Sequence, residues 1–326
     1  MDERRLVRRE LRYALRVVVV LVIAGAVILA LVSQVGHLPH IHWRIRPAWL
    51  LLAVVGFVIL QLIHAQLWGL ILRWLGYPLP GPRARAIWST SLLARYVPTN
   101  LLMVVVRITS AERAGIPKRV TAASVVYEIP LTVAGSLALG AYFVVVLPSL
   151  AHQPLRFAVV AAPVLLVLLL HPRLFAPMAQ FLLTRMGREP LPTRLGFSRV
   201  LALGALYVGS FVVAGLATYA FARTLYAVPA AHAATVVGAF SVGYVASIVG
   251  FMLPAGIGAR EAAFTAALAP VLPASVALAV AVGVRLVQIP IEIAYALVTP
   301  LLARRSDPSP RRKASTSASD SGVPIS

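Results

Sequence analysis

The chain lacks cysteine and carries little charge, and both shortages narrow the class of protein. Without cysteine it can form no disulfide, no thiolate metal site and no cysteine nucleophile. Only 12% of its 326 residues are charged, roughly half the fraction typical of a soluble domain. It also lacks a Walker motif, a G-x-S-x-G element and an H-E-x-x-H element, so nothing predicts ATP hydrolysis or these hydrolase chemistries. We predict no cofactor.

A closed set of metal ligands is absent too. His37, His40 and His42 lie in one short loop, but no carboxylate is close to them in the sequence. Histidines beside an apolar run are better explained as residues of the membrane interface than as a zinc site. We therefore predict no metal site.

Long apolar runs dominate what is present, since 60% of the residues are hydrophobic. A helix needs roughly 20 apolar residues to cross a bilayer, and several runs approach or exceed that length. The runs are continuous rather than alternating, which disfavours a β-barrel. The sequence predicts an all-α, polytopic helical membrane protein with about six full spans and two opposed re-entrant helical hairpins. The six spans are predicted at 16–33, 48–72, 120–147, 155–170, 200–226 and 275–303.

Basic residues give the predicted orientation. The net charge is +20, and because arginines cluster beside apolar runs, topology and anionic lipid headgroups explain it better than nucleic acid. Six arginines lie in 1–16, five in 172–199, and four with one lysine in 304–326. Since these residues favour the cytoplasmic side, we predict a basic cytoplasmic N-terminus (1–16), one transmembrane domain (17–303) and a disordered cytoplasmic tail (304–326). A retained first helix is favoured over a signal peptide, because its apolar run is long and no clear cleavage site follows.

Two segments are too broken to be ordinary spans. The segment 87–106 has basic residues on both flanks, so it is predicted to enter and leave from the cytoplasmic face. The same orientation places both ends of 233–272 on the outer face, which predicts a second re-entrant hairpin with "PAGIGARE" at its tip. Residues 233–253 are also long enough to cross fully, and that alternative stays open. Broken backbone inside a membrane occurs where it is buried in protein or lines a watery cavity.

The tip of the second hairpin carries the first candidate site. Pro254 ends the incoming helix, and Gly256 and Gly258 permit positive φ. Arg260 could clamp a phosphate at the start of the following helix, and Glu261 could pair with an arginine or with an amine headgroup. A turn at the membrane surface with a satisfied ion pair explains the same residues equally well.

The last span adds a polar face. Arg285, Gln288 and Glu292 are three and four residues apart and share one side of a helix. Each is costly against lipid tails, so we expect them to face the protein interior. Arg285 and Glu292 lie about 10 Å apart along the axis, so each needs a partner from another helix.

The third predicted span has a polar stripe around one carboxylate. Thr121, Ser124, Glu128, Thr132 and Ser136 follow one another at helical spacing. We favour a cavity wall, because a carboxylate inside a membrane is costly without a role. The alternative is ordinary Ser/Thr packing between helices around a satisfied carboxylate.

The first hairpin carries a further candidate site. Arg95, Asn100 and Arg107 flank a break at Pro98, and they could receive a lipid headgroup from the inner leaflet.

Two stretches resemble a known family. The stretch "LLARYVPTNLLMVVVRITSAERAGIPKRVTAASVVYEIPL" resembles part of the membrane region of lysylphosphatidylglycerol synthases and of related bacterial flippase-like membrane proteins. "LPAGIGAREAAF" resembles that family's P-x-G-[IVL]-G-x-R-E element. In the first stretch the family has glycine where this chain has Thr99, so that hairpin could bend differently. The matching positions are Arg95, Tyr96, Pro98, Arg107, Gly115, Glu128, Pro254, Gly256, Gly258, Arg260 and Glu261.

The resemblance implies movement of a polar, phosphate-containing lipid between the leaflets of a bacterial inner membrane. The synthases carry a large soluble catalytic domain after this region, and this sequence shows only a short polar tail, so lysyl transfer is not expected. Anionic membrane lipids are the expected partners. Two alternatives remain: an intramembrane glycosyl- or group-transferase with a lipid-phosphate donor, and a non-catalytic partner of a lipid-modifying enzyme. A homo-oligomer is compatible with each of these functions.

Overall fold

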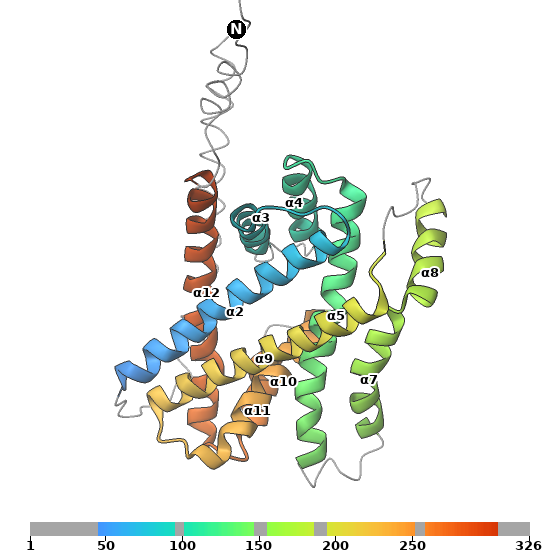
Figure 1. The fold of residues 1–326 in the computed structure, drawn as a ribbon. Coiled ribbons are helices and arrows are strands. Elements are labelled where there is room, and N and C mark those ends of the chain that lie inside the picture. Colours follow the sequence, from blue (N-terminus) through green and yellow to red (C-terminus); the bar gives the residue numbers. More distant parts are fainter. Residues whose placement is uncertain (1–44, 95–100, 147–154, 186–193, 252–257, 306–326) are drawn as a thin grey trace, which may run out of the picture.

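The computed structural model describes residues 45–94, 101–146, 155–185, 194–251 and 258–305, and these ranges are built from helices (Figure 1). Five helices in the described ranges are long and apolar enough to cross a membrane by length and composition. The chain is therefore a polytopic helical membrane protein, as predicted. In chain order the helices are α2 (Pro47–Trp74), α3 (Gly81–Leu93), α4 (Leu101–Glu112), α5 (Lys118–Val146), α7 (Leu155–Leu169), α8 (Pro172–Arg185), α9 (Phe197–Leu225), the short 3-10 helix η2 (Ala230–His232), α10 (Ala233–Phe251), α11 (Ala259–Leu268) and α12 (Ala274–Arg305).

Most predicted spans agree with these helices. Helices α2, α5, α9 and α12 coincide with four of them within a few residues, and α5 continues through Pro130. The predicted span at 155–170 forms α7, which has only 15 residues. The apolar segment Ala230–Ile248 is itself long enough to cross, so the re-entrant course of 233–272 stays a prediction. The predicted first span, the N-terminus and nearly all of the tail lie outside the described residues, as do the three histidines.

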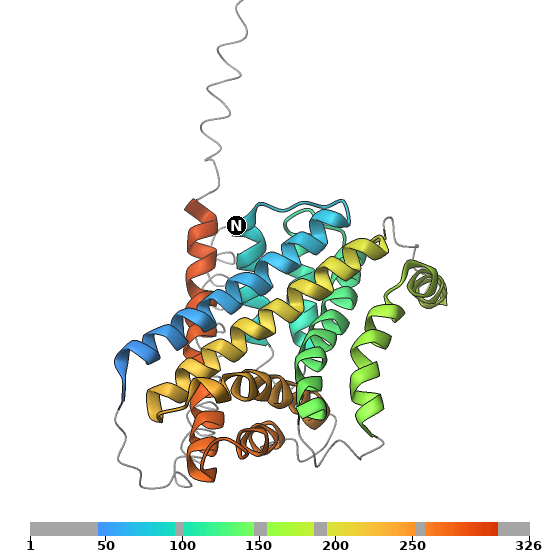
Figure 2. The same ribbon diagram turned by 60° about the horizontal axis from the view of Figure 1, so that its bottom comes forward.

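Helices α2 and α9 run side by side across the molecule, which both ribbon views show (Figures 1 and 2). Gly56 lets them approach, because a Cβ there would lie 2.7 Å from a side-chain carbon of α9. Cation–π contacts join the pair at both ends. The Arg223 guanidinium lies 4.3 Å from the ring centroid of Trp49, and that of Arg199 lies 5.8 Å from the ring of Trp74. Such contacts contribute about 0.5–1 kcal/mol each when exposed.

Glycines also bring α9 close to its other neighbours. A Cβ on Gly215 would lie 2.5 Å from the carbonyl oxygen of Val237 in α10. A Cβ on Gly283 of α12 would lie 2.5 Å from the ring of Phe221 in α9. Membrane helices gain little from hydrophobic burial against one another, so close packing through small residues is a main source of their association.

Two helix pairs, α3–α4 and α10–α11, each pack one member against the same long helix, α12: α3 from the first pair and α11 from the second. Helix α3 contacts the C-terminal half of α12, where the hydroxyls of Ser89 and Thr299 form a 2.6 Å hydrogen bond. Helix α11 contacts the N-terminal half. Pro290 lies inside α12 between these two regions. The pairs cover most residues of the two predicted hairpins, whose re-entrant course stays a prediction, and α12 contacts both pairs.

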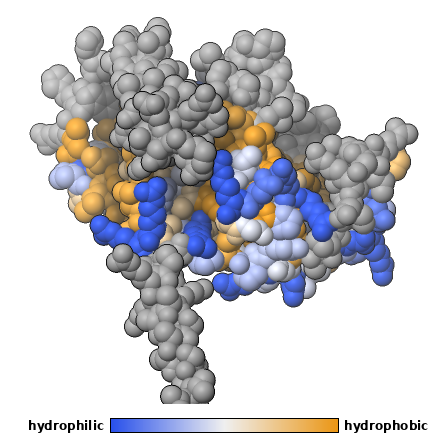
Figure 3. Space-filling view, turned by 90° about the horizontal axis from the view of Figure 1, so that it is seen from above, coloured by the Kyte–Doolittle hydropathy of each residue, from blue (hydrophilic) through white to orange (hydrophobic). Residues whose placement is uncertain are grey.

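Basic residues collect at one end of the molecule. Most of the helix ends that carry them point toward the upper part of Figure 1, and Figure 3 looks onto that end and shows hydrophilic residues along one side of it. At the opposite helix ends the described ranges place Arg46, Arg156 and Arg223. This asymmetry is the pattern of a protein with a fixed orientation in a membrane. The residues of the basic end are Arg73, Arg83, Arg85, Arg113, Lys118, Arg119, Arg173, Arg194, Arg199, Arg304 and Arg305.

Candidate functional site

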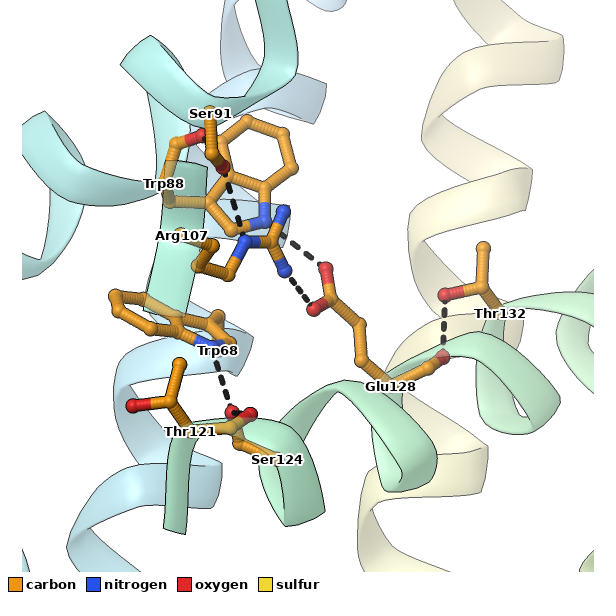
Figure 4. A network of polar contacts seen from close by, with 8 residues as sticks. All are labelled: Trp68, Trp88, Ser91, Arg107, Thr121, Ser124, Glu128 and Thr132. Atoms are coloured by element: carbon orange, nitrogen blue, oxygen red, sulfur yellow. Dashed lines mark hydrogen bonds and ion pairs between the residues drawn. The ribbon is translucent and has the colours of Figure 1, made fainter. Parts of the chain in front are cut away.

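The first candidate group surrounds a buried arginine between the first hairpin and α5 (Figure 4). Arg107 of α4 is 1% exposed and forms an ion pair with Glu128 of α5. Its Nε donates to the Ser91 hydroxyl at 2.9 Å, and its guanidinium lies 5.5 Å and 6.0 Å from the ring centroids of Trp68 and Trp88. The Trp88 indole N–H donates to the second carboxylate oxygen at 3.0 Å. Both Glu128 oxygens are therefore occupied, as a buried charge requires.

Most of the polar stripe on α5 is satisfied in the same way, although the hydroxyl of Thr121 is buried without a hydrogen-bond partner among the described residues. The Ser124 hydroxyl donates to the carbonyl of Thr121 at 2.7 Å and accepts the indole N–H of Trp68 at 3.0 Å. The hydroxyls of Thr132 and Ser136 donate to backbone carbonyls one turn earlier, at 2.7 Å and 2.9 Å. These contacts agree with helix packing around a satisfied carboxylate, the alternative to the cavity wall that we favoured from the sequence.

The second candidate group joins α11 to α12. Gly258 precedes α11 with φ +97°, a left-handed conformation that glycine adopts without strain. Arg285 of α12 donates through Nη1 to Glu261 Oε1 at 2.6 Å. Arg260 donates through Nη2 to the side-chain oxygen of Gln288 at 3.1 Å. The expectation that Arg285 takes its partner from another helix is confirmed.

The charged side chains of this second group differ in their exposure to solvent. The Arg285 side chain is 43% exposed, whereas that of Glu261 is 7% exposed. Glu292, one turn beyond Gln288 on α12, is 5% exposed. A half-exposed arginine beside a buried carboxylate can still bind an anion, while the carboxylate offsets part of its charge.

By their hydrogen bonds and ion pairs, the described site residues fall into two groups. Arg107 and Glu128 belong to the first; Gly258, Arg260, Glu261, Arg285 and Gln288 belong to the second, with Glu292 nearby on α12. Four predicted residues lie outside the described residues: Arg95, Asn100, Pro254 and Gly256.

Sequence reasoning missed three side chains around Arg107. Ser91 and Trp88 lie three residues apart on α3 and so share one face, which is a signal that we could have used. For Trp68 the sequence showed a face shared with Gln61 and His64, but it did not show that this face meets α4.

Comparison with known families agrees with the helical membrane architecture. The family described as "Lysylphosphatidylglycerol synthase TM region" matches residues 14–294. That range includes every described residue of both candidate groups. No curated protein matches the chain.

Proposed function

Because this chain belongs to the family of the lysylphosphatidylglycerol synthase TM region, we propose that it moves a phosphate-containing polar lipid between the leaflets of a bacterial inner membrane. The second group of residues, at α11 and α12, receives the headgroup. Arg260 and Arg285 hold the phosphate, and Glu261 balances their charge. The protein acts as a transporter rather than as an enzyme.

The position of Arg285 is the observation that carries this proposal. It lies about 16 Å from the start of α12 and about 30 Å from its end, at 1.5 Å per residue, so it is far from both ends of a spanning helix. Charged residues at such positions are costly, and they face the interior of the bundle or a watery path. The Arg285 side chain is 43% exposed and pairs with a buried carboxylate. A passing lipid phosphate is an anion that this guanidinium suits.

The same contacts weaken both alternative functions. A transferase needs a carboxylate that is free to accept a proton, but Glu128 accepts hydrogen bonds on both oxygens and Glu261 is held in an ion pair with Arg285. A passive partner protein would use its membrane charges to bind an enzyme, but Arg285 is paired within the chain. We therefore prefer lipid movement to either alternative.

The proposed orientation follows from the basic end described above. That end faces the cytoplasm by the positive-inside rule. In this orientation the α3–α4 hairpin opens toward the cytoplasm and the α10–α11 hairpin belongs to the outer half of the molecule. Broken helices that approach from opposite sides are a common construction of transporter sites.

Reconstitution tests the function. The full chain is reconstituted in vesicles that contain a lipid with a fluorescent label on its acyl chain. Transfer between leaflets is measured as the rate at which the labelled lipid becomes accessible to a quencher added outside the vesicles. We expect wild-type protein to accelerate transfer and Arg285→Gln to lower the rate by about tenfold, the loss of one charge-assisted contact. Arg304→Gln, an exposed arginine at the end of the same helix, is the matched control and should keep the wild-type rate.

Two results would contradict the proposal. Transfer in protein vesicles that equals transfer in empty vesicles would remove lipid movement as the function. Equal loss in Arg285→Gln and Arg304→Gln would show that general charge, rather than the α11–α12 group, supports transfer.

A further inference from the structure

Helix α11 carries two buried polar atoms that lack a hydrogen-bond partner among the described residues. They are Glu261 Oε2 and the hydroxyl of Thr265. The two residues are four apart, so they lie one turn from each other on the same face of α11. A buried carboxylate oxygen without a donor is costly.

The chemistry of the unpaired Glu261 Oε2 limits which group could form a hydrogen bond with it. An ionised carboxylate only accepts hydrogen bonds, and Arg285 already occupies the other oxygen. The missing partner must therefore be a donor. A free metal cation would gain little here, because Arg285 already balances the charge of Glu261. A hydroxyl, or an ammonium whose charge is balanced by its own phosphate, meets the requirement.

The neighbouring charges place this donor next to an anion. The half-exposed side chain of Arg285 lies beside the buried carboxylate, and Arg260 precedes Glu261 in the first turn of α11. The site thus offers positive groups for a phosphate and an acceptor immediately beside them. Phospholipid headgroups with an N–H or O–H group a few bonds from the phosphate match both features.

We propose that the α11–α12 group selects phospholipids whose headgroup donates a hydrogen bond next to the phosphate, with Glu261 as the acceptor that distinguishes them. This inference rests on the proposed lipid transport and names its substrate class. Phosphatidylethanolamine and phosphatidylglycerol belong to that class. Phosphatidylcholine does not: it has the same charges as phosphatidylethanolamine, but methyl groups replace every N–H.

A series of N-methylated lipids tests the selection without any mutation. The full wild-type chain is reconstituted with acyl-labelled phosphatidylethanolamine, its monomethyl and dimethyl derivatives, and phosphatidylcholine. The first three retain at least one N–H. We expect them to cross at similar rates, and phosphatidylcholine to cross about tenfold more slowly, the loss of one hydrogen bond to a charged group. Labelled phosphatidylglycerol should cross at a rate close to that of phosphatidylethanolamine.

Variants then assign the selection to Glu261. Glu261→Gln should bring the rates for phosphatidylethanolamine and phosphatidylcholine within about twofold of each other, because an amide no longer supplies two acceptor oxygens. Glu112→Gln, which alters an exposed carboxylate on α4, should keep the wild-type ratio. If Glu261→Gln does not fold, the wild-type series still decides the question.

The outcomes separate this inference from the function on which it rests. Equal transfer of all four lipids would overturn the selection and leave lipid transport standing. A step at the first or second methylation, before the last N–H is lost, would indicate size rather than hydrogen bonding and would also overturn it. An unchanged ratio in Glu261→Gln would remove the role of that residue. Failure of every lipid to move would overturn the proposed function, and the selection with it.

Discussion

The buried pair of Arg107 and Glu128 gives the sharpest prediction about stability. Glu128→Leu leaves a guanidinium that is 1% exposed without its counter-charge. Breaking a buried ion pair on one side typically costs 3–5 kcal/mol. The two tryptophan rings and one serine hydroxyl remain beside the guanidinium, so we expect a loss near the lower end, about 3 kcal/mol of unfolding free energy.

Two companion variants make the reasoning quantitative. The double variant Arg107→Leu with Glu128→Leu removes both charges, and apolar replacement of a buried pair is often nearly neutral. We therefore expect it to be more stable than Glu128→Leu alone by about 2 kcal/mol, a coupling typical of residues in direct contact. Glu112→Leu breaks an exposed pair whose side chains are 62% and 48% exposed, and it should cost no more than about 0.5 kcal/mol.

Equilibrium unfolding in mixed micelles measures these differences. Purified full-length variants are titrated with sodium dodecyl sulfate, and the loss of helix is followed by circular dichroism in both directions to confirm reversibility. If Glu128→Leu costs no more than Glu112→Leu, the pair is not sheltered as the structure shows. If the double variant is no more stable than Glu128→Leu alone, the two side chains do not interact as the structure shows.

Three further predictions use other features of the structure. Gly215→Ala should destabilise the protein by about 1–3 kcal/mol through overpacking against α10, whereas Gly209→Ala on the same helix has open space around its Cβ and should be neutral or slightly stabilising; melting temperatures in detergent compare the two. Trp88→Phe should cost about 1 kcal/mol, because the buried carboxylate loses one donor, and the micelle titration measures it. Because the chain has no cysteine, single cysteines at Ser198 and Ala231 can be labelled in intact cells by an impermeant reagent. Only the cysteine at Ala231 should react from outside, and equal labelling would contradict the proposed orientation.

The helices were largely predictable from the sequence because their signal is local. An apolar run shows its own length, and the four long spans agree with α2, α5, α9 and α12 within a few residues. Proline was a weaker guide. Pro130, Pro290 and Pro300 all lie inside continuous helices, since a long helix packed among others can tolerate the loss of one hydrogen bond.

Partners were harder to predict than positions. The sequence indicated that Glu128 and Arg285 need opposite charges, because a lone charge in a membrane is costly. It did not indicate that Arg107, 21 residues earlier, is the partner of Glu128. That pairing depends on how the first hairpin folds back against α5, and the period of a helix carries no information about it. The left-handed conformation of Gly258 before α11 was predictable, since glycine adopts positive φ without strain.

Both helix pairs contact the same continuous helix, α12, and this couples their movements. The α3–α4 pair is hydrogen-bonded to α12 after Pro290, through Thr299. The α10–α11 pair is hydrogen-bonded to α12 before Pro290, through Arg285 and Gln288. A proline removes one backbone hydrogen bond and concentrates bending at its position. Bending of α12 at Pro290 therefore changes the angle between the segment that binds α3 and the segment that binds α11. A movement of one helix pair is then transmitted through α12 to the other pair.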